Sequence, residues 1–597
     1  MVFSLLLPWC LPAVETSTTS PAPVVPGQYW SNETPRRPDV PEPRLSGRIA
    51  NPIDAFILHH LDPRGLKPSN PAPKRTLLRR LSLDVTGLPP TPKEVRTFVI
   101  NVAEDAYEAE VNRLLASERF GERMAQVWLD AVRYERFHDG GTEAAYRAYV
   151  IGAFNRNTPF DRFTEDQLTG SRETSTKGAL PGSAALFGGQ ESGCRDDVNG
   201  RAVAKRDMAP LKVRTLSEAW LGATLACAQC HDHPYDPFGK DDFHRMAAFF
   251  SGAGEAGEGG GGSGDAVRPG FPRCLNGGES GERKAETLAD LARWLTWRGQ
   301  PRTARVFVNR MWKEFFGTGI SKVVDDLGGG SEWPVHPELL DWLAVEFMES
   351  GWDVKHMIRL MVTSFTYRQS SIPTRESLEK DPGNRWLGSQ SPRPLDTAGM
   401  RDNALFLGGL LKEDIAGPSF RPFNLWDLLE EWDEDTDGEP SKDVDAHHRR
   451  SLYMEPGLKR GKEMMRDPAD GSDAGACPFS KAPPMPWRGD PLSDPIYLEA
   501  SRGFAQRLLG VKGSDADRIR EAFEWAMVRP AERGEIKSLE RVLKTQRGHY
   551  KGHPEEAVAL LAMSRAPFKK DLEPREWAAW IEVCRVILNL EETYTRY

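Results

Sequence analysis

The chain has 597 residues, which is enough for several domains with large hydrophobic cores. Hydrophobic residues make up 39% of it and charged residues 28%, as in an ordinary globular protein, and the formal net charge of −9 gives no electrostatic basis for binding nucleic acid or anionic membranes. No apolar run reaches the roughly 18 residues that a transmembrane helix needs, and the seven scattered cysteines do not form the pattern of a disulfide framework.

Residues 1–44 are predicted to precede the first folded domain. Residues 2–12 are apolar, like the core of a signal peptide, although no basic residue precedes them and no clear small-residue cleavage site follows. Residues 15–45 are rich in Pro, Ser and Thr and lack hydrophobic periodicity, which is typical of an extended linker. We interpret the apolar start as an atypical or truncated signal and expect a periplasmic or otherwise exported protein.

A helical domain is predicted over residues 45–250. Its first clear helix covers residues 75–85 and ends at Gly87. Thr91 and Glu94 then form a capping box around Pro92, so the next helix begins there. An apolar stripe over residues 107–115 has helical spacing and predicts a further helix.

The most informative motif of this domain is Cys227-Ala228-Gln229-Cys230-His231. Cys-x-x-Cys-His is the attachment signature of a c-type haem, because the two thiols can add to the porphyrin vinyl groups and the adjacent imidazole can ligate the iron. The apolar residues 220–226 predict a helix that runs into the motif, and two prolines soon after it end the helix. We therefore assign Cys227, Cys230 and His231 as candidate haem-binding residues.

The residues after the cysteines allow a second interpretation. His231, Asp232, His233 and Asp236 lie in a loop that two prolines make rigid, and rigid loops are good binding sites. Together with the two thiols, His231 and His233 could ligate zinc, and Asp236 could line a pocket. Turn formation alone also accounts for Asp and Pro in this stretch.

Asp130 and Arg133 lie three positions apart at the end of a predicted helix. Such a pair usually makes an ion pair on one helix face, worth about 0.2–0.5 kcal/mol. Aromatic neighbours make the two residues candidates for a pocket wall as well. We expect them to pair and to stabilise the first domain rather than to perform chemistry.

Residues 251–283 are predicted to link the first domain to a second one over residues 284–597. Residues 252–264 are almost entirely Gly, Ala and Glu, which is typical of a flexible linker. Helical patterning resumes at Lys284, and Pro574 begins a last helix. Strand signals are few and short. The predicted fold class is therefore mainly α, with two helical domains joined by a Gly-rich linker and little β structure.

The second domain contributes the remaining candidate pocket residues. Asn309 and Arg310 belong to a dense polar and aromatic cluster. Asp325 and Asp326 precede a glycine and could ligate a cation, although adjacent acids at such a place more often form a turn or a helix cap. His336 could line the same site, and the proline after it favours a helix start instead.

Together these motifs resemble a family of paired domains that abounds in planctomycetes and related bacteria. In that family a planctomycete cytochrome C-type domain of unknown function is followed by a planctomycete-specific C-terminal domain. The resemblance covers nearly the whole chain from about residue 45. In the first domain it is carried by Asn51-Pro52-Ile53-Asp54, by residues 79–92, 113–117, 128–130 and 159–163, and by the cysteine block 220–233. In the second domain it is carried by Val308-Asn309-Arg310 and by residues 325–326, 336–343, 367–371 and 451–453.

The resemblance implies an exported protein of bacteria that degrade complex polysaccharides, in a family without an established activity. We accordingly expect a c-type-cytochrome-like protein that carries haem c, transfers electrons to a redox partner protein or serves a haem-dependent oxidoreductase, and acts near a carbohydrate ligand. The alternative is a zinc- or calcium-dependent carbohydrate-binding or hydrolytic protein in which residues 227–236 form a structural metal site. A scaffold protein without catalysis is a third class.

Overall fold

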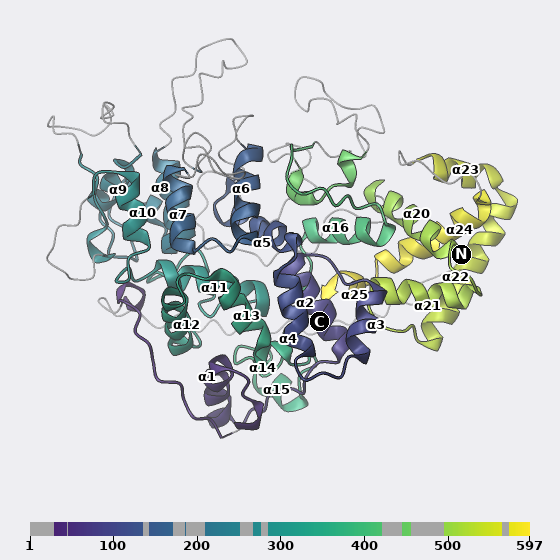
Figure 1. Ribbon diagram of the computed structural model, residues 1–597, viewed down its shortest axis with the longest axis horizontal. Helices are drawn as coiled ribbons and strands as arrows, with labels where there is room; N and C mark the ends of the chain where they lie inside the picture. Colours follow the sequence, from purple (N-terminus) through teal and green to yellow (C-terminus); the bar gives the residue numbers. More distant parts are fainter. Residues whose placement is uncertain are drawn as a thin grey trace, which may run out of the picture.

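The computed structural model describes residues 29–44, 46–134, 143–170, 186, 209–250, 267–275, 285–420, 445–454, 495–563 and 572–597. The signal-like residues 2–12 and the glycine-rich residues 252–264 lie outside these ranges. Helices dominate the described residues, which confirms the predicted fold class (Figure 1). None of the described helices combines the length and apolarity that crossing a bilayer requires.

In the part of the chain up to the glycine-rich segment, the described residues are mainly helical. Its α-helices are α1 (Pro52–Leu61), α2 (Lys74–Thr86), α3 (Pro92–Ile100), α4 (Ala106–Leu115), α5 (Glu118–Ala131), α6 (Glu143–Asn155), α7 (Phe160–Thr169), α8 (Ala209–Leu216) and α9 (Lys240–Ala247). A π-helix covers Ser217–Leu221. The 3₁₀ helices are Trp30–Asn32, Ser46–Arg48, Asp62–Arg64 and Leu225–Gln229, and Arg273–Leu275 follows the glycine-rich segment.

The remaining part is also helical. Its α-helices are α10 (Leu288–Leu295), α11 (Thr303–Phe316), α12 (Pro337–Glu349), α13 (Val354–Thr363), α14 (Phe365–Arg368), α15 (Arg375–Lys380), α16 (Thr397–Gly408), α20 (Pro495–Leu509), α21 (Asp515–Ala526), α22 (Arg533–Gly552), α23 (Pro554–Ala562), α24 (Pro574–Leu588) and α25 (Glu591–Tyr594). Short 3₁₀ helices cover Ala446–His448 and Ser451–Tyr453. Among the described residues, regular strands are limited to β1 (Arg393–Pro394) and β2 (Thr595–Arg596), which pair antiparallel with Arg393 opposite Arg596.

Local sequence signals explain where the first helices begin and end. α2 ends at Gly87, which adopts φ 74° and donates its N–H to the Leu83 carbonyl. Glycine adopts this left-handed conformation without steric cost, so it ends helices well. α3 begins in a capping box formed by Thr91 and Glu94. The helices expected near residues 75–85 and after Thr91 are thus confirmed.

Buried apolar side chains form two clusters. The larger one includes Trp128, Trp220, Phe307 and Phe347, and therefore combines residues from before and after the glycine-rich segment. The smaller one is built by α16 and α20–α24, around side chains such as Trp580, and α21–α24 gather at the right of the view in Figure 1. The domain boundary expected at residues 251–283 thus falls within the sequence span of the larger core, and it stays a sequence-based prediction.

Asp54 shows what one of the family-like motifs does in this chain. Its carboxylate accepts hydrogen bonds from the backbone N–H groups of Ala50 and Asn51 at the start of α1. The same carboxylate also accepts from the N–H groups of Phe365 and Thr366, at 2.9 and 2.8 Å. Asp54 is buried, so these bonds are protected from water. The Asn-Pro-Ile-Asp motif therefore fixes α1 against α14, more than 300 residues away.

The family-like motif at residues 79–92 joins α2 to residues 593–597. The Arg79 guanidinium donates to the Thr593 and Thr595 carbonyls, and Arg80 donates to the Tyr597 carbonyl. Asp84 accepts from the Tyr367 hydroxyl at 2.8 Å and pairs with Arg393 and Arg596, which are mostly buried. Because these groups are buried and mutually bonded, they hold the fold together rather than present chemistry to a substrate.

Candidate functional site

The chain approaches the cysteine motif through a helix that breaks before it. α8 continues into the π-helix, which ends where Gly222 adopts φ 51°. A Cβ atom at Gly222 would lie 2.8 Å from Val306 Cγ2, so the close approach of α11 requires glycine. The expected continuous helix through residues 220–226 is therefore wrong. Cys227 follows on a separate 3₁₀ helix, Leu225–Gln229, and Cys230 lies directly after that helix.

Cys227, Cys230 and His231 all lie at the surface, and both cysteines are free thiols. The apolar members of the same stretch, Leu225 and Ala228, are buried and anchor it to the core. The Nδ1 atom of His231 lies 2.7 Å from the Asp232 carbonyl oxygen. Because a carbonyl can only accept, Nδ1 carries the proton in this contact and the Nε2 lone pair of the neutral ring is available for a metal.

His233 is engaged within the protein. Its Nδ1 accepts hydrogen bonds from the backbone N–H groups of Tyr235 and Asp236, and its Nε2 lies 2.9 Å from the Thr224 hydroxyl oxygen. Nδ1 therefore has no proton, and burial lowers the pKa of His233, which keeps the ring neutral. The 3.8 Å separation between His233 Nδ1 and Asp236 Oδ2 thus joins two acceptors and is not an ion pair.

The loop that contains His233 is closed by further hydrogen bonds. The His233 N–H donates to the Phe238 carbonyl at 2.8 Å. The Asp232 carboxylate accepts from the Lys240 N–H at the start of α9, and Asp242 accepts from the Gly239 N–H. Residues 231–240 are therefore tied back onto themselves, as expected for a rigid loop beside the cysteines.

A buried ion pair fixes this loop to α11. Asp236 and Arg302 are both buried, and Asp236 Oδ1 lies 3.3 Å from Arg302 Nη2. Arg302 also donates to the Gly222 carbonyl and to Asn32 Oδ1. The same Asp236 oxygen accepts from the Gly329 N–H at 3.1 Å. One guanidinium thus holds the chain on both sides of the cysteine motif.

The two adjacent acids predicted as possible cation ligands have different roles. Asp326 Oδ1 accepts from the Gly328 N–H at 2.8 Å, which is the turn that an acid before glycine commonly forms. Burial, aided by the nearby Asp236 carboxylate, raises the pKa of Asp326. Asp325 instead pairs with Arg310 at 2.8 Å and lies 3.9 Å from Arg133.

Arg310 and Arg133 connect Asp325 to the π-helix and to the end of α5. Arg310 donates to the Ala219 carbonyl of the π-helix at 2.9 Å, so it braces the segment that leads to the cysteines. Arg133 has φ 51°, just past the end of α5, and its side chain is directed to Asp325. The pair with Asp130 that the sequence suggested stays a prediction. Asp130 itself is exposed at the end of α5.

Two candidate pocket residues have their contacts elsewhere. Asn309 is buried and exchanges two hydrogen bonds with the backbone of Ser321, at 2.8 and 3.0 Å, so it clasps the loop after α11. His336 is 2% exposed and precedes α12, which confirms the helix start at Pro337. Its ring lies 4.7 Å from that of His60 and 5.7 Å from that of Trp386, centroid to centroid.

We expect His336 to make the fold acid-sensitive. Burial lowers the pKa of His336 to about 3, against 6.5 for the ordinary side chain, and His60 and Arg64 add to the shift. Between those values the unfolded chain binds a proton that the folded chain does not. Above pH 6.5 the lowered pKa of His336 does not change the free energy of unfolding. Below pH 6.5 it lowers the free energy of unfolding by about 1.4 kcal/mol for each pH unit, until about pH 3. Urea unfolding of His336→Phe and of the natural chain should differ by an amount that changes only below pH 6.5. A difference that is independent of pH would contradict this assignment.

Sequence reasoning did not identify Arg302, Thr224 or Gly329. Arg302 is fully buried and its carboxylate partner lies 66 positions away in the sequence. No local pattern marks such an arginine, because a guanidinium at a helix start normally points to solvent. The Pro-Arg-Thr sequence at 301–303 carries no signal that distinguishes it from a surface turn.

The family comparison agrees with the pattern of motifs. Residues 52–255 match PSCyt2, a protein family of unknown function (DUF1549), and residues 288–543 match PSD1, a protein family of unknown function (DUF1553). These are the planctomycete cytochrome-C-like domain and its paired C-terminal domain, in that order. The chain belongs to the family that combines these two domains, and the expected membership is confirmed. No curated protein and no solved structure matches the chain.

Proposed function

We propose that this chain is an exported c-type-cytochrome-like protein that holds haem c at Cys227, Cys230 and His231. The observation that carries the proposal is the His231 ring, whose Nδ1 is bonded to the Asp232 carbonyl and whose Nε2 could ligate the iron beside two exposed free thiols. When bound, haem c supplies an iron that carries one electron, and electron transfer is the resulting function.

The residues around the motif support this assignment by fixing the ligands. Arg302 holds Gly222 before the cysteines and Asp236 after them. Asp232 and the bond between His233 and Phe238 restrain the loop that follows His231. A rigid protein frame around a redox centre is favourable, because it keeps the ligand geometry unchanged when the charge changes.

The contacts of His233 favour haem over a four-ligand zinc site. Zinc would need Cys227, Cys230 and two histidines around one point. Both ring nitrogens of His233 already have partners inside the protein, at Thr224 and at two backbone N–H groups. In the part of the chain that the structure describes, no three of the Cys and His side chains of this block bring their ligand atoms within 4.8 Å of one another.

Covalent haem on the exported protein tests the proposal. The full chain, produced with an export signal and a haem-attachment system, should show one covalent haem by intact mass. Cys227→Ala and Cys230→Ala should each lose or weaken attachment, because each thiol makes one thioether bond. His231→Ala should mainly change the absorption spectrum, because it removes the axial ligand and leaves the thiols.

Cys274→Ala is the matched control, since Cys274 is a half-buried free thiol outside the motif. It should leave the haem content unchanged. Attachment that survives the loss of both Cys227 and Cys230 would refute the assignment. A colourless ion released by all three variants, together with a loss of stability, would favour the zinc alternative, because metal-binding energy is then folding energy.

A further inference from the structure

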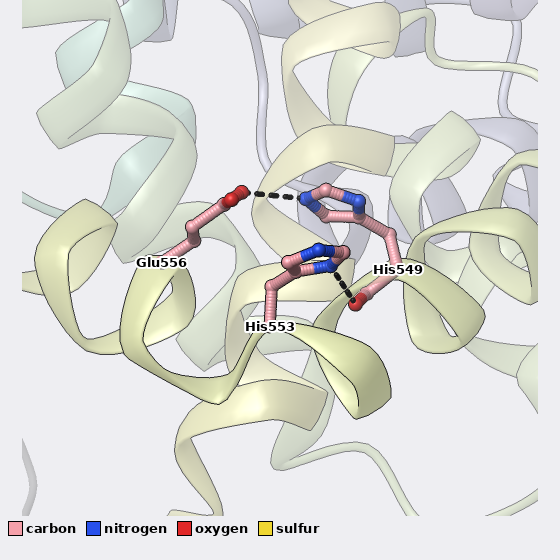
Figure 2. A group of neighbouring side chains, drawn as sticks. All are labelled: His549, His553 and Glu556. Atoms are coloured by element: carbon pink, nitrogen blue, oxygen red, sulfur yellow. Dashed lines mark hydrogen bonds and ion pairs between the residues drawn. The ribbon is translucent and has the colours of Figure 1, made fainter.

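Three exposed side chains meet where α22 ends and α23 begins, in the C-terminal helical cluster. Figure 2 shows His549, His553 and Glu556 pointing toward one another. One possible ligand atom from each lies within 4.8 Å of the others. Among the residues that the structure describes, this is the group of three or more His, Cys, Asp or Glu side chains gathered closely enough to hold a metal ion.

The chain places these residues together through its helix geometry. His549 lies in the last turn of α22, His553 stands between the two helices, and Glu556 lies in the first turn of α23. Spacings of four and three residues bring side chains to one face of a helical segment. The two imidazole rings are stacked, with centroids 4.8 Å apart and planes 26° from parallel.

The hydrogen bonds bring possible ligand atoms of the three residues together and orient one of the rings. The Nδ1 of His553 lies 3.2 Å from the His549 carbonyl oxygen and donates its proton there, so its Nε2 keeps the lone pair. This is the type of outer contact that orients metal-binding histidines. The Nε2 of His549 lies 2.7 Å from Glu556 Oε2, so an imidazole and a carboxylate already converge (Figure 2). Zinc takes the place of the proton between these two atoms, and that proton is released to the solvent.

We propose that His549, His553 and Glu556 bind a zinc-class divalent metal ion that cross-links α22 to α23. Two imidazoles and one carboxylate are a ligand set that zinc accepts, with a fourth position left for water. Zinc bonds of about 2.0–2.2 Å place tetrahedral ligands about 3.3–3.5 Å apart. The present separations need only small side-chain rotations to reach this, and exposed side chains rotate easily.

A second His–Glu contact in the chain shows which feature matters. His356 Nε2 lies 2.8 Å from Glu346 Oε1, almost the same distance as in the proposed site, and its ring is similarly accessible. Among the residues that the structure describes, no third ligand completes a group around that pair. It should therefore bind zinc much more weakly, because two ligands seldom hold the ion.

Calorimetric titration of the full chain with Zn²⁺ tests the proposal. His553→Ala, His549→Ala and Glu556→Gln should each lose one equivalent of bound zinc relative to the natural chain. Zn²⁺ should raise the thermal unfolding midpoint of the natural chain and should raise it less in these variants, because the ion binds the folded junction of α22 and α23. Counting the difference between variants separates this site from zinc held by thiols elsewhere.

Glu555→Gln and His356→Ala are the matched controls. Glu555 is an exposed acid next to Glu556 on α23, and both controls should retain the full zinc stoichiometry. Zn²⁺ should also protect His549 and His553, but not His356, from modification by diethyl pyrocarbonate, detected by mass spectrometry. Equal zinc binding by the natural chain and by His553→Ala, or equal modification with and without zinc, would overturn the proposal.

Discussion

Replacing Arg450 by methionine is expected to lower the free energy of unfolding by about 3–5 kcal/mol, because it leaves two buried carboxylates without their cation. Arg450 Nη1 lies 3.0 Å from Glu122 on α5, and Arg450 Nε lies 3.0 Å from Asp402 on α16. All three side chains are at most 3% exposed. Arg450 also donates to the Thr86 carbonyl at the end of α2. The loss should appear as a lower urea midpoint and a lower thermal midpoint.

Two comparisons show whether the unpaired charges are the cause. Neutralising the partners in the same background, with Glu122→Gln and Asp402→Asn, should recover part of the lost stability, because the buried charge is removed. Arg119→Met on α5 is the comparison, since Arg119 is partly exposed and its partner Glu413 is largely in solvent. That variant should cost no more than about 1 kcal/mol. Similar losses for Arg450→Met and Arg119→Met would show that the buried network contributes little.

The second large effect is expected at Arg302. Arg302→Met should also cost about 3–5 kcal/mol, since it leaves Asp236 buried without its partner. It should in addition loosen the chain on both sides of the cysteines, because Arg302 bonds to Gly222 and to Asp236. Hydrogen exchange should report this as faster exchange in residues 222–240, including the His233 N–H that bonds to the Phe238 carbonyl.

Arg305→Met provides the matched control for that experiment. Arg305 is one turn further along α11, and its side chain is 3% exposed and pairs with Asp341, away from the cysteine loop. This variant should destabilise the protein while the exchange of residues 222–240 stays close to that of the natural chain. If both arginine variants speed exchange in residues 222–240 equally, Arg302 has no special role in holding the loop.

Much of the local structure could be predicted from the sequence. The capping box at Thr91 and Glu94 and the glycine at position 87 set helix ends correctly, because these signals act over one or two turns. The mainly α fold followed from apolar spacing in the same way. The helix end at Gly222 was not predicted, and one reason for glycine there, the close approach of Val306, exists only in the folded chain.

The structure brings some of the candidate site residues together and separates others. The structure gathers Asp236, Asp326, Asp325 and Arg310 around the segment that carries the cysteines, but the polar contacts of Asn309 and the ring contacts of His336 are elsewhere. Residue type alone cannot separate site residues from structural ones, because Asn and His occur both in functional sites and in buried hydrogen bonds or ring contacts that stabilise the fold. Contacts with residues far away in the sequence decide which role each residue has, and the local spacing of residues does not reveal these contacts.

The roles of the family-like motifs were likewise hidden from the sequence. Asp54 and Asp84 are acids of the kind that perform catalysis, yet both are buried and bonded to distant backbone or arginine groups. In this structure both residues connect elements from before and after the glycine-rich segment. A variant at either position should therefore be evaluated first by its stability and only then by its activity.

The absorption spectrum of the exported full chain tests the haem assignment most directly. With haem c attached at Cys227 and Cys230, the protein should show a Soret band in a ratio of one haem per chain, and the colour should stay with the protein after acid–acetone extraction. A colourless exported protein, produced beside a haem-attachment system that loads a known c-type cytochrome and carrying stoichiometric zinc on the same two thiols, would contradict it.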